Sequence, residues 1–221
     1  CREARRATRV AILHIVVVAN GELPSPHAAE MAQVFADADQ LVAVDGGLVH
    51  CVDLGVWPSV LLGDLDSAPP ALVEQANLHQ VRLLTFPADK DATDLELAFE
   101  FAADAGATKL TVVAGFGGRL DHELATIALL ASDRWCDLTV TATDGQRLLH
   151  VVRSSCILAL AVGATVSLVP WHDDVVGVTT QGLRWPLRNE TLELGTTRGV
   201  SNLAEESSQS VTVGSGVLFG I

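Results

Sequence analysis

Apolar runs rich in β-branched residues alternate with alanine-rich stretches through the first two-thirds of the chain, and this alternation limits the possible folds strongly. Each apolar run has the length of a strand, and each alanine-rich stretch has the length of a helix. Strands that alternate with helices form βαβ units, in which a parallel sheet carries helices on its faces. We therefore expect an N-terminal, Rossmann-like α/β domain with a parallel sheet and helices on both faces.

The helix expected over residues 93–105 has the clearest pattern. Leu95, Phe99 and Ala102 contribute to a broad apolar face, and Gly106 follows as a stop signal. The full set of expected strands is 11–19, 41–44, 60–62, 81–85, 110–114 and 138–142, and the expected helices are 27–38, 48–54, 70–76, 93–105 and 120–132.

The pattern changes after about Gly145, where helix-forming residues become sparse. Short runs of valine, threonine and leucine then recur between glycines, which is typical of a small antiparallel sandwich or barrel. We expect an α/β domain over residues 1–144 and a small C-terminal antiparallel β-sandwich over 145–221. The strands expected in this second part are 148–152, 157–160, 165–169, 175–179, 191–194 and 211–213.

Composition excludes several classes of protein. With 49% apolar and 19% charged residues, the chain is expected to form a packed core rather than a disordered one. The net charge of −13, from 27 acidic and 14 basic residues, argues against general nucleic-acid binding, which needs a basic surface. No run approaches the roughly 18 apolar residues that span a bilayer, so we expect no membrane partner.

Two features bear on where the protein acts. Four cysteines without a CxxC spacing imply no disulfide framework, so a reducing cytoplasm is expected. Arginines between Arg2 and Arg9 precede the apolar run 10–19, which superficially resembles a signal peptide. That run contains His14 and leads into Asn20-Gly21, a loop signal, so we interpret it as a first core strand.

Asp64 and Asp66 follow the apolar run 60–62, where a strand is expected to end. In an extended segment, side chains two residues apart project from the same face. Two carboxylates this close repel each other unless a cation lies between them or one is protonated. The pair therefore indicates a metal site, although a turn that uses Asp66 and Ser67 before the next helix explains it as well.

Lys90, Asp91, Thr93 and Asp94 form a second cluster of this kind after the strand expected at 81–85. Asp91 followed three residues later by Asp94 also resembles a helix N-cap with an acidic partner. Capping does not account for Lys90, which is a suitable counter-charge for phosphate oxygens. Both interpretations, a ligand site and a helix cap, remain open at this point.

Glycines accompany the remaining charged candidates. Asp45 precedes two glycines at the end of the second expected strand, which is more often a turn than a site. The glycine-rich segment 115–122 follows the fifth strand and contains Arg119, Asp121 and His122. Such a strand-to-helix turn offers backbone N–H groups to an anion, and Asp121 with His122 suits the orientation or deprotonation of a hydroxyl group.

In this order the motifs DGG, GDxDS, KDxTD and GGRxDH, which span Asp45 to His122, resemble the thiamine pyrophosphokinase family. The β-rich tail extends the resemblance through GLRWPL at 182–187 and through Ser201-Asn202. None of these motifs is specific alone, whereas their combination is.

The resemblance implies an enzyme that transfers a pyrophosphoryl group from ATP to the hydroxyl of thiamine, with Mg²⁺ as cofactor. It also implies a homodimer whose active sites are shared between subunits. Without the resemblance, Trp185 would be interpreted as a core residue. By the motif match, Asp64, Asp66 and Asp94 hold the metal and act in catalysis with Arg119 and Asp121, while Asp45, Lys90, Asp91, Thr93, His122, Trp185, Ser201 and Asn202 bind ATP or thiamine.

Two departures from the family pattern concern substrate contacts. Thr126 stands where bacterial members usually carry asparagine, and Leu203 stands where glutamate is common. One alternative function is pyrophosphoryl transfer to another hydroxymethyl heterocycle, such as a reduced pterin. Another is a non-catalytic regulator that binds a nucleotide or thiamine. Trp185 and Ser201-Asn202 argue against the first, and the complete set of metal-binding acids argues against the second.

Overall fold

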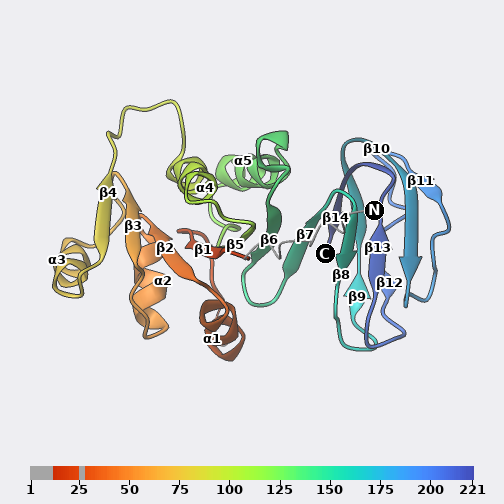
Figure 1. Cartoon of the computed structure of the whole chain (residues 1–221), viewed down its shortest axis with the longest axis horizontal. Coiled ribbons are helices and arrows are strands. Elements are labelled where there is room, and N and C mark those ends of the chain that lie inside the picture. The colour runs from red at the N-terminus through yellow and green to blue at the C-terminus, as the bar shows by residue number, and fades with distance from the viewer. Residues whose placement is uncertain (1–11, 25–27) are drawn as a thin grey trace, which may run out of the picture.

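A parallel sheet forms the first half of the molecule (Figure 1). The structure is a computed structural model that describes residues 12–24 and 28–221. Neighbouring strands pair in parallel in the order β4-β3-β2-β1-β5-β6. Their bounds are β1 (His14–Val18), β2 (Gln40–Val44), β3 (Val60–Gly63), β4 (Arg82–Thr85), β5 (Lys109–Val113) and β6 (Thr139–Thr143).

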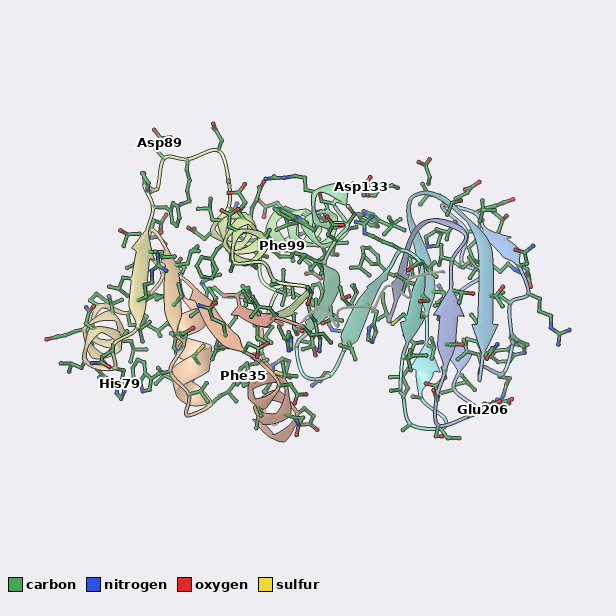
Figure 2. The ribbon with its side chains drawn as sticks, viewed as in Figure 1. Phe35, His79, Asp89, Phe99, Asp133 and Glu206 are labelled. Carbon is green, nitrogen blue, oxygen red and sulfur yellow. The ribbon has the colours of Figure 1, made fainter. Side chains whose placement is uncertain are left out.

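Helices cover both faces of this sheet because its central strand is apolar on both sides. Alternate residues of β1 belong to separate hydrophobic clusters: Ile15 packs in the cluster that contains Phe99 of α4, and Val16 in the cluster that contains Met31 of α1. Figure 1 shows α1, α2 and α3 on one side and α4 and α5 on the other, and Figure 2 places Phe99 between α4 and the sheet. The bounds are α1 (Ala28–Ala36), α2 (Gly47–Asp53), α3 (Pro70–Leu78), α4 (Asp94–Asp104) and α5 (Leu120–Leu130).

Antiparallel strands continue the same sheet beyond β6. The order β6-β7-β14-β10-β13-β8 follows, with β11 paired to β10 and a separate two-stranded sheet of β9 and β12. Val178, Leu192 and Leu218 belong to the hydrophobic cluster of this part. The remaining elements are the 3₁₀ helix η1 (Asp133–Trp135), β7 (Leu148–Val152), β8 (Ser155–Ile157), β9 (Thr165–Val166), β10 (Leu168–Gln181), β11 (Glu190–Leu192), β12 (Asn202–Leu203), β13 (Ser210–Thr212) and β14 (Ser215–Gly220).

The expected fold class is confirmed, whereas several expected boundaries in the second half are wrong. The strand expected at 157–160 ends at Ile157, after which Leu158 and Leu160 donate backbone N–H groups to Gln209. The strand expected at 175–179 is a short part of the 14-residue β10. The glycine-rich β14 was not expected at all, although it pairs with both β7 and β10.

The N-terminal expectations fall partly outside the described residues. Cys1, Arg2 to Arg9, Ala11 and His27 are not among them, while β1 begins at His14 and confirms a strand within the run 10–19. The cysteines that the structure describes are free of disulfides. Among the described residues, no helix combines the length and the apolar character needed to cross a bilayer.

A buried acidic side chain holds the tight turn between β6 and β7. Asp144 is 1% exposed, and its carboxylate accepts hydrogen bonds from the backbone N–H groups of Gln146 and Arg147 and from the Arg147 guanidinium. Burial alone would raise the pKa of Asp144, but these hydrogen bonds outweigh it and lower that pKa. This turn therefore joins the parallel part of the sheet to the antiparallel part through a charged network.

Replacing Asp144 by alanine should lower the free energy of unfolding by about 2–3 kcal/mol, because charge-assisted hydrogen bonds at a buried carboxylate are lost. The pKa of Asp144 is lower in the folded chain than in the unfolded one. Its contribution is therefore complete above the unfolded pKa of about 3.9 and is lost as the pH falls through the lower, folded value. Urea denaturation between pH 7 and pH 3 measures this, with the exposed Asp137→Ala variant as the control. An Asp144→Ala deficit that does not shrink in acid would contradict it.

Candidate active site

The strand order reverses between β1 and β5: from β1 the chain continues to β2 on one side, and from β5 it continues to β6 on the other. The chain leaves β1 for the side of α1 and leaves β5 for the side of α5, so the loops after these two strands separate and open a crevice (Figure 1). Open α/β sheets bind ligands at such a point, outside the carboxyl ends of the strands. The fold therefore places the candidate site at the carboxyl edge of β1 and β5.

Backbone hydrogen bonds fix the base of this crevice. The N–H of Gly21 donates to Ala114 O over 2.8 Å, and the N–H of Glu22 donates to Phe116 O over 2.7 Å. A side-chain carbon at Gly21 would lie 2.3 Å from Phe116 O and 2.4 Å from Ala114 O, so this position accepts no larger residue without backbone movement. The sequence showed Asn20-Gly21 merely as a loop signal, whereas both residues line the site.

A cavity of about 660 Å³ occupies this edge of the sheet. Its walls come from the loops after β1, β2, β3, β4 and β5, from the first turn of α4 and from α5 as far as Leu129. Asp91, Asp121, Trp185, Ser201 and Asn202 are not in its lining. The predicted site residues that line it are Asp45, Asp64, Asp66, Lys90, Thr93, Asp94, Arg119 and His122.

Three carboxylates converge in the cavity. One oxygen each from Asp45, Asp64 and Asp66 lies within 4.8 Å of the others. Burial raises the pKa of Asp45 despite hydrogen bonds from Ser67, and Asp66 and Asp64 add to the rise. Such a donor set fits a hard divalent cation, which binds carboxylate oxygens. Asp45, which the sequence analysis assigned to ATP or thiamine binding, thus lies within the acidic group itself.

Local turn bonds and the acidic cluster coexist after β3. The N–H of Asp66 donates to Asp64 Oδ1 over 3.1 Å, and the Ser67 hydroxyl donates to Asp66 Oδ1 over 2.9 Å. The hydrogen bond from Asp66 lowers the pKa of Asp64 against the effect of burial, and Lys90 adds to this lowering. A turn is therefore present before α3, but Asp64, and not Asp66 as expected from the sequence, accepts the backbone N–H, and this leaves Asp64 Oδ2 for a cation.

Asp94 and Lys90 complete the cluster. The ammonium of Lys90 lies 3.3 Å from Asp94 Oδ1 and 3.4 Å from Asp64 Oδ2. Burial would lower the pKa of Lys90, but Asp94 and Asp64 raise it above its usual value. A side-chain carbon at Gly63 would lie 3.2 Å from Asp45 Cβ and 3.3 Å from Asp94 Oδ1, so the glycine lets these two acids approach each other.

The helix cap falls at Thr93 and not at Asp91. Thr93 Oγ1 accepts a hydrogen bond from the N–H of Glu96 over 3.2 Å, and α4 starts at Asp94. The alternative in which Asp91 caps the helix with Asp94 as its partner is therefore wrong. Because Thr93 performs the capping, Asp94 is available to the acidic cluster.

Arg119 and Asp121 pair with each other at the start of α5. The guanidinium donates to both carboxylate oxygens, over 3.1 Å and 2.6 Å, and this pairing raises the pKa of Arg119 and lowers that of Asp121. Both side chains are exposed. A bound phosphate must therefore compete with Asp121 for Arg119.

Glu123, which the sequence analysis did not select, accepts a hydrogen bond from the Gly117 N–H over 3.3 Å.

Trp185 lies in a different part of the chain from the cavity. Trp185 is 57% exposed, so it is not the core residue that its sequence context alone would suggest. Asn202 accepts from the N–H of Trp185 over 3.1 Å and donates to its carbonyl over 2.7 Å, so Asn202 fixes the backbone that presents the ring. Ser201, beside it, has a φ of +63°, which is a strained backbone for serine.

A second hollow of about 690 Å³ lies between α5 and the antiparallel strands and contains none of the predicted site residues. Its arginine, Arg153, already binds Asp133 Oδ1, Ala131 O and Ser132 O. Because those acceptors already engage the arginine, the acid-lined cavity is the better candidate for the site.

An acidic cluster that faces a glycine-rich, arginine-bearing loop defines a site of the phosphoryl-transfer class. The chain belongs to the thiamin pyrophosphokinase family. A model described as "Thiamin pyrophosphokinase, catalytic domain" matches residues 31–162, and one described as "Thiamin pyrophosphokinase, vitamin B1 binding domain" matches residues 154–218.

A curated relative agrees with this membership, and solved structures share the fold. The chain is 28% identical over 182 residues to the thiamine pyrophosphokinase of Bacillus subtilis, which covers 81% of this chain and 85% of that protein. The crystal structure of the thiamine pyrophosphokinase from Bacillus subtilis has a TM-score of 0.81 over 94% of this chain and 97% of that one, at 24% identity. That of thiamin pyrophosphokinase from Geobacillus thermodenitrificans has a TM-score of 0.75 over 95% and 96%, at 28% identity.

The capping geometry predicts different stabilities for two neighbouring variants. Thr93→Ala should lower the free energy of unfolding by about 1 kcal/mol, because the N–H of Glu96 loses its acceptor. Asp94→Asn should cost about half of that or less, because Asp94 makes no capping hydrogen bond and the variant loses only its attraction to Lys90 and to the start of α4. Urea denaturation of both variants measures the difference. An equal or larger loss for Asp94→Asn would contradict this division of roles.

Proposed function

We propose that the protein transfers the pyrophosphoryl group of ATP to the hydroxyl of thiamine, giving thiamine diphosphate and AMP. In this reaction the thiamine oxygen forms a bond to the β-phosphorus of ATP, the bond between that phosphorus and the α–β bridging oxygen breaks, and the hydroxyl proton is released. The observation that carries the proposal is the match of both family domains to a chain whose acids gather at one crevice. Neither a pterin-type substrate nor a non-catalytic regulator has support from these comparisons.

The acidic cluster is the proposed magnesium site. Asp64, Asp66 and Asp94 are the proposed ligands, and Asp45 lies close enough to contribute a fourth carboxylate. When bound, Mg²⁺ supplies positive charge that neutralises phosphate oxygens. The convergence of Asp45, Asp64 and Asp66 supports this assignment, and Asp94 adjoins the group through Lys90, whose ammonium contacts both Asp94 Oδ1 and Asp64 Oδ2.

The rest of the cavity suits ATP. Lys90 and Arg119 are the proposed side-chain partners of the phosphates. The glycine-rich loop, where Gly117 and Gly118 have φ values of +86° and +78°, is proposed to add backbone N–H groups once the Gly117 N–H leaves Glu123. Asp121 is proposed to contact substrate after Arg119 turns from it to a phosphate. Contacts to ATP or thiamine by Asp91, Thr93 and His122 remain predictions from the motif match.

Thiamine is proposed to bind at Trp185, Ser201 and Asn202 of the antiparallel part. Because these residues do not line the acid-bearing cavity of their own chain, we propose a homodimer in which each active site combines the acids of one subunit with Trp185 of the other. A cytoplasmic location is part of the same proposal and is supported by free cysteines among the described residues.

The first test of this function is an assay of AMP release with thiamine, ATP and Mg²⁺. Wild type should release AMP only when thiamine is present. Asp66→Asn should reduce turnover at least about a hundredfold, because the charge that holds the metal is lost. Asp53→Asn, at an exposed acid at the end of α2, is the matched control and should retain wild-type turnover. Near-normal turnover in Asp66→Asn would contradict the metal assignment.

The second test concerns the thiamine site and the dimer. Trp185→Ala should weaken thiamine binding about tenfold or more through lost stacking on a cationic aromatic ring, with ATP binding unchanged. A mixed dimer that carries Trp185→Ala in one chain and Asp66→Asn in the other is assayed with thiamine well below the wild-type KM, where the weaker binding lowers the rate. It should retain about half of the wild-type rate, since shared sites place both lesions together. A rate of about a tenth of wild type or less would show that each site belongs to one chain.

A further inference from the structure

Lys90 occupies a position between two of the proposed metal ligands. Its ammonium contacts Asp94 Oδ1 at 3.3 Å and Asp64 Oδ2 at 3.4 Å, and it donates to Pro87 O over 3.0 Å. The three charged side chains are between 15% and 19% exposed, so solvent screens their attraction incompletely. In this structure the ammonium is the cation that offsets the repulsion within the acidic cluster.

The oxygens that Lys90 contacts are the ones best suited to a metal ion. Asp64 Oδ1 already accepts the N–H of Asp66, which leaves Oδ2 as the freer oxygen. Asp94 Oδ1 is buried and accepts no hydrogen bond from the described residues. A divalent cation that binds these two oxygens therefore replaces the ammonium, because two positive centres on the same pair of oxygens repel each other strongly.

The loop that carries Lys90 permits such a replacement. Residues 86–93 connect β4 to α4 and extend away from the sheet, with Asp89 on the exposed outer part of the loop (Figure 2). Pro87, Asp89 and Asp91 are all exposed, so the backbone around Lys90 is not packed into a core. A displaced ammonium loses two carboxylates, and a phosphate group provides an equivalent anionic partner.

We propose that Lys90 is an exchangeable internal cation that makes metal binding depend on the nucleotide. Without ligands it neutralises Asp64 and Asp94; when the metal takes those oxygens, the ammonium moves to a phosphate of the incoming nucleotide. Metal alone must displace the lysine without a new partner for it, whereas metal with nucleotide provides one. The two ligands therefore bind with positive coupling, and each raises the affinity for the other by the same factor. This inference rests on the proposed function.

The test measures metal affinity directly, with Mn²⁺ as the probe and electron paramagnetic resonance of free Mn²⁺ as the readout. Wild type and Lys90→Met are titrated with and without an ATP analogue that has a methylene group in place of the α–β bridging oxygen. Lys109→Met is the matched control, since it removes the same charge from a lysine outside the cavity. Thermal unfolding in EDTA verifies folding, and Lys90→Gln replaces Lys90→Met if the latter does not fold.

Lys90→Met should bind Mn²⁺ without nucleotide at least about fivefold more tightly than wild type, at the lower end of couplings between sites. The analogue should raise Mn²⁺ affinity by a smaller factor in Lys90→Met than in wild type, and Lys109→Met should resemble wild type in both respects. Unchanged or weaker Mn²⁺ binding by Lys90→Met, with AMP release intact in wild type, overturns the exchange alone. A wild-type protein that neither binds Mn²⁺ nor releases AMP overturns the proposed function and the exchange together.

Discussion

The pairing of β1 with both β2 and β5 is the contact on which the remaining structure depends. Because β1 is buried on both faces, it requires helices on both sides of the sheet, and the helices that follow β1 and β5 cover opposite faces. That arrangement opens the crevice at the carboxyl edge. Gly21 then ties the loop after β1 to the loop after β5, so the hydrophobic core and the base of the site are fixed by the same pair of strands.

Like charges at the crevice destabilise the fold, whereas the hydrophobic core below it stabilises the fold. Asp45, Asp64 and Asp66 gather where strands end, and Asp94 joins them from the start of α4. Burial raises the pKa of Asp45, while Lys90 offsets part of the repulsion. Asp45 also has a φ of +49°, which is uncommon for a residue other than glycine. Strain and like charge at one edge lower stability locally, and they are typical of places where a protein binds ligands. The stable parallel core makes this arrangement possible.

Much of the α/β part was predictable from the sequence because its strands are continuous apolar runs that end at turn residues. The cap at Thr93 was not, because Asp91 and Thr93 both suit an N-cap, and the choice depends on which residue adopts the extended backbone before the helix. The place of Asp45 in the acidic group depends on pairing between β2 and β3, which a single DGG motif does not reveal. β14 was not predicted because its glycines disfavour a strand locally. Its pairing with β7 and β10, which lie far away in the sequence, is what makes it a strand.

The division at residues 144 and 145 stays a prediction, and the turn at Asp144 shows what such a cut would sever. β6 and β7 are neighbouring, hydrogen-bonded strands of one sheet, so no flexible linker separates the two parts. A fragment that ended at residue 144 would leave β6 as a bare edge strand, with unpaired N–H and C=O groups that favour aggregation. The two parts therefore carry different proposed binding residues but do not form independently folding domains. A large hinge motion at this junction would require breaking the hydrogen bonds between β6 and β7.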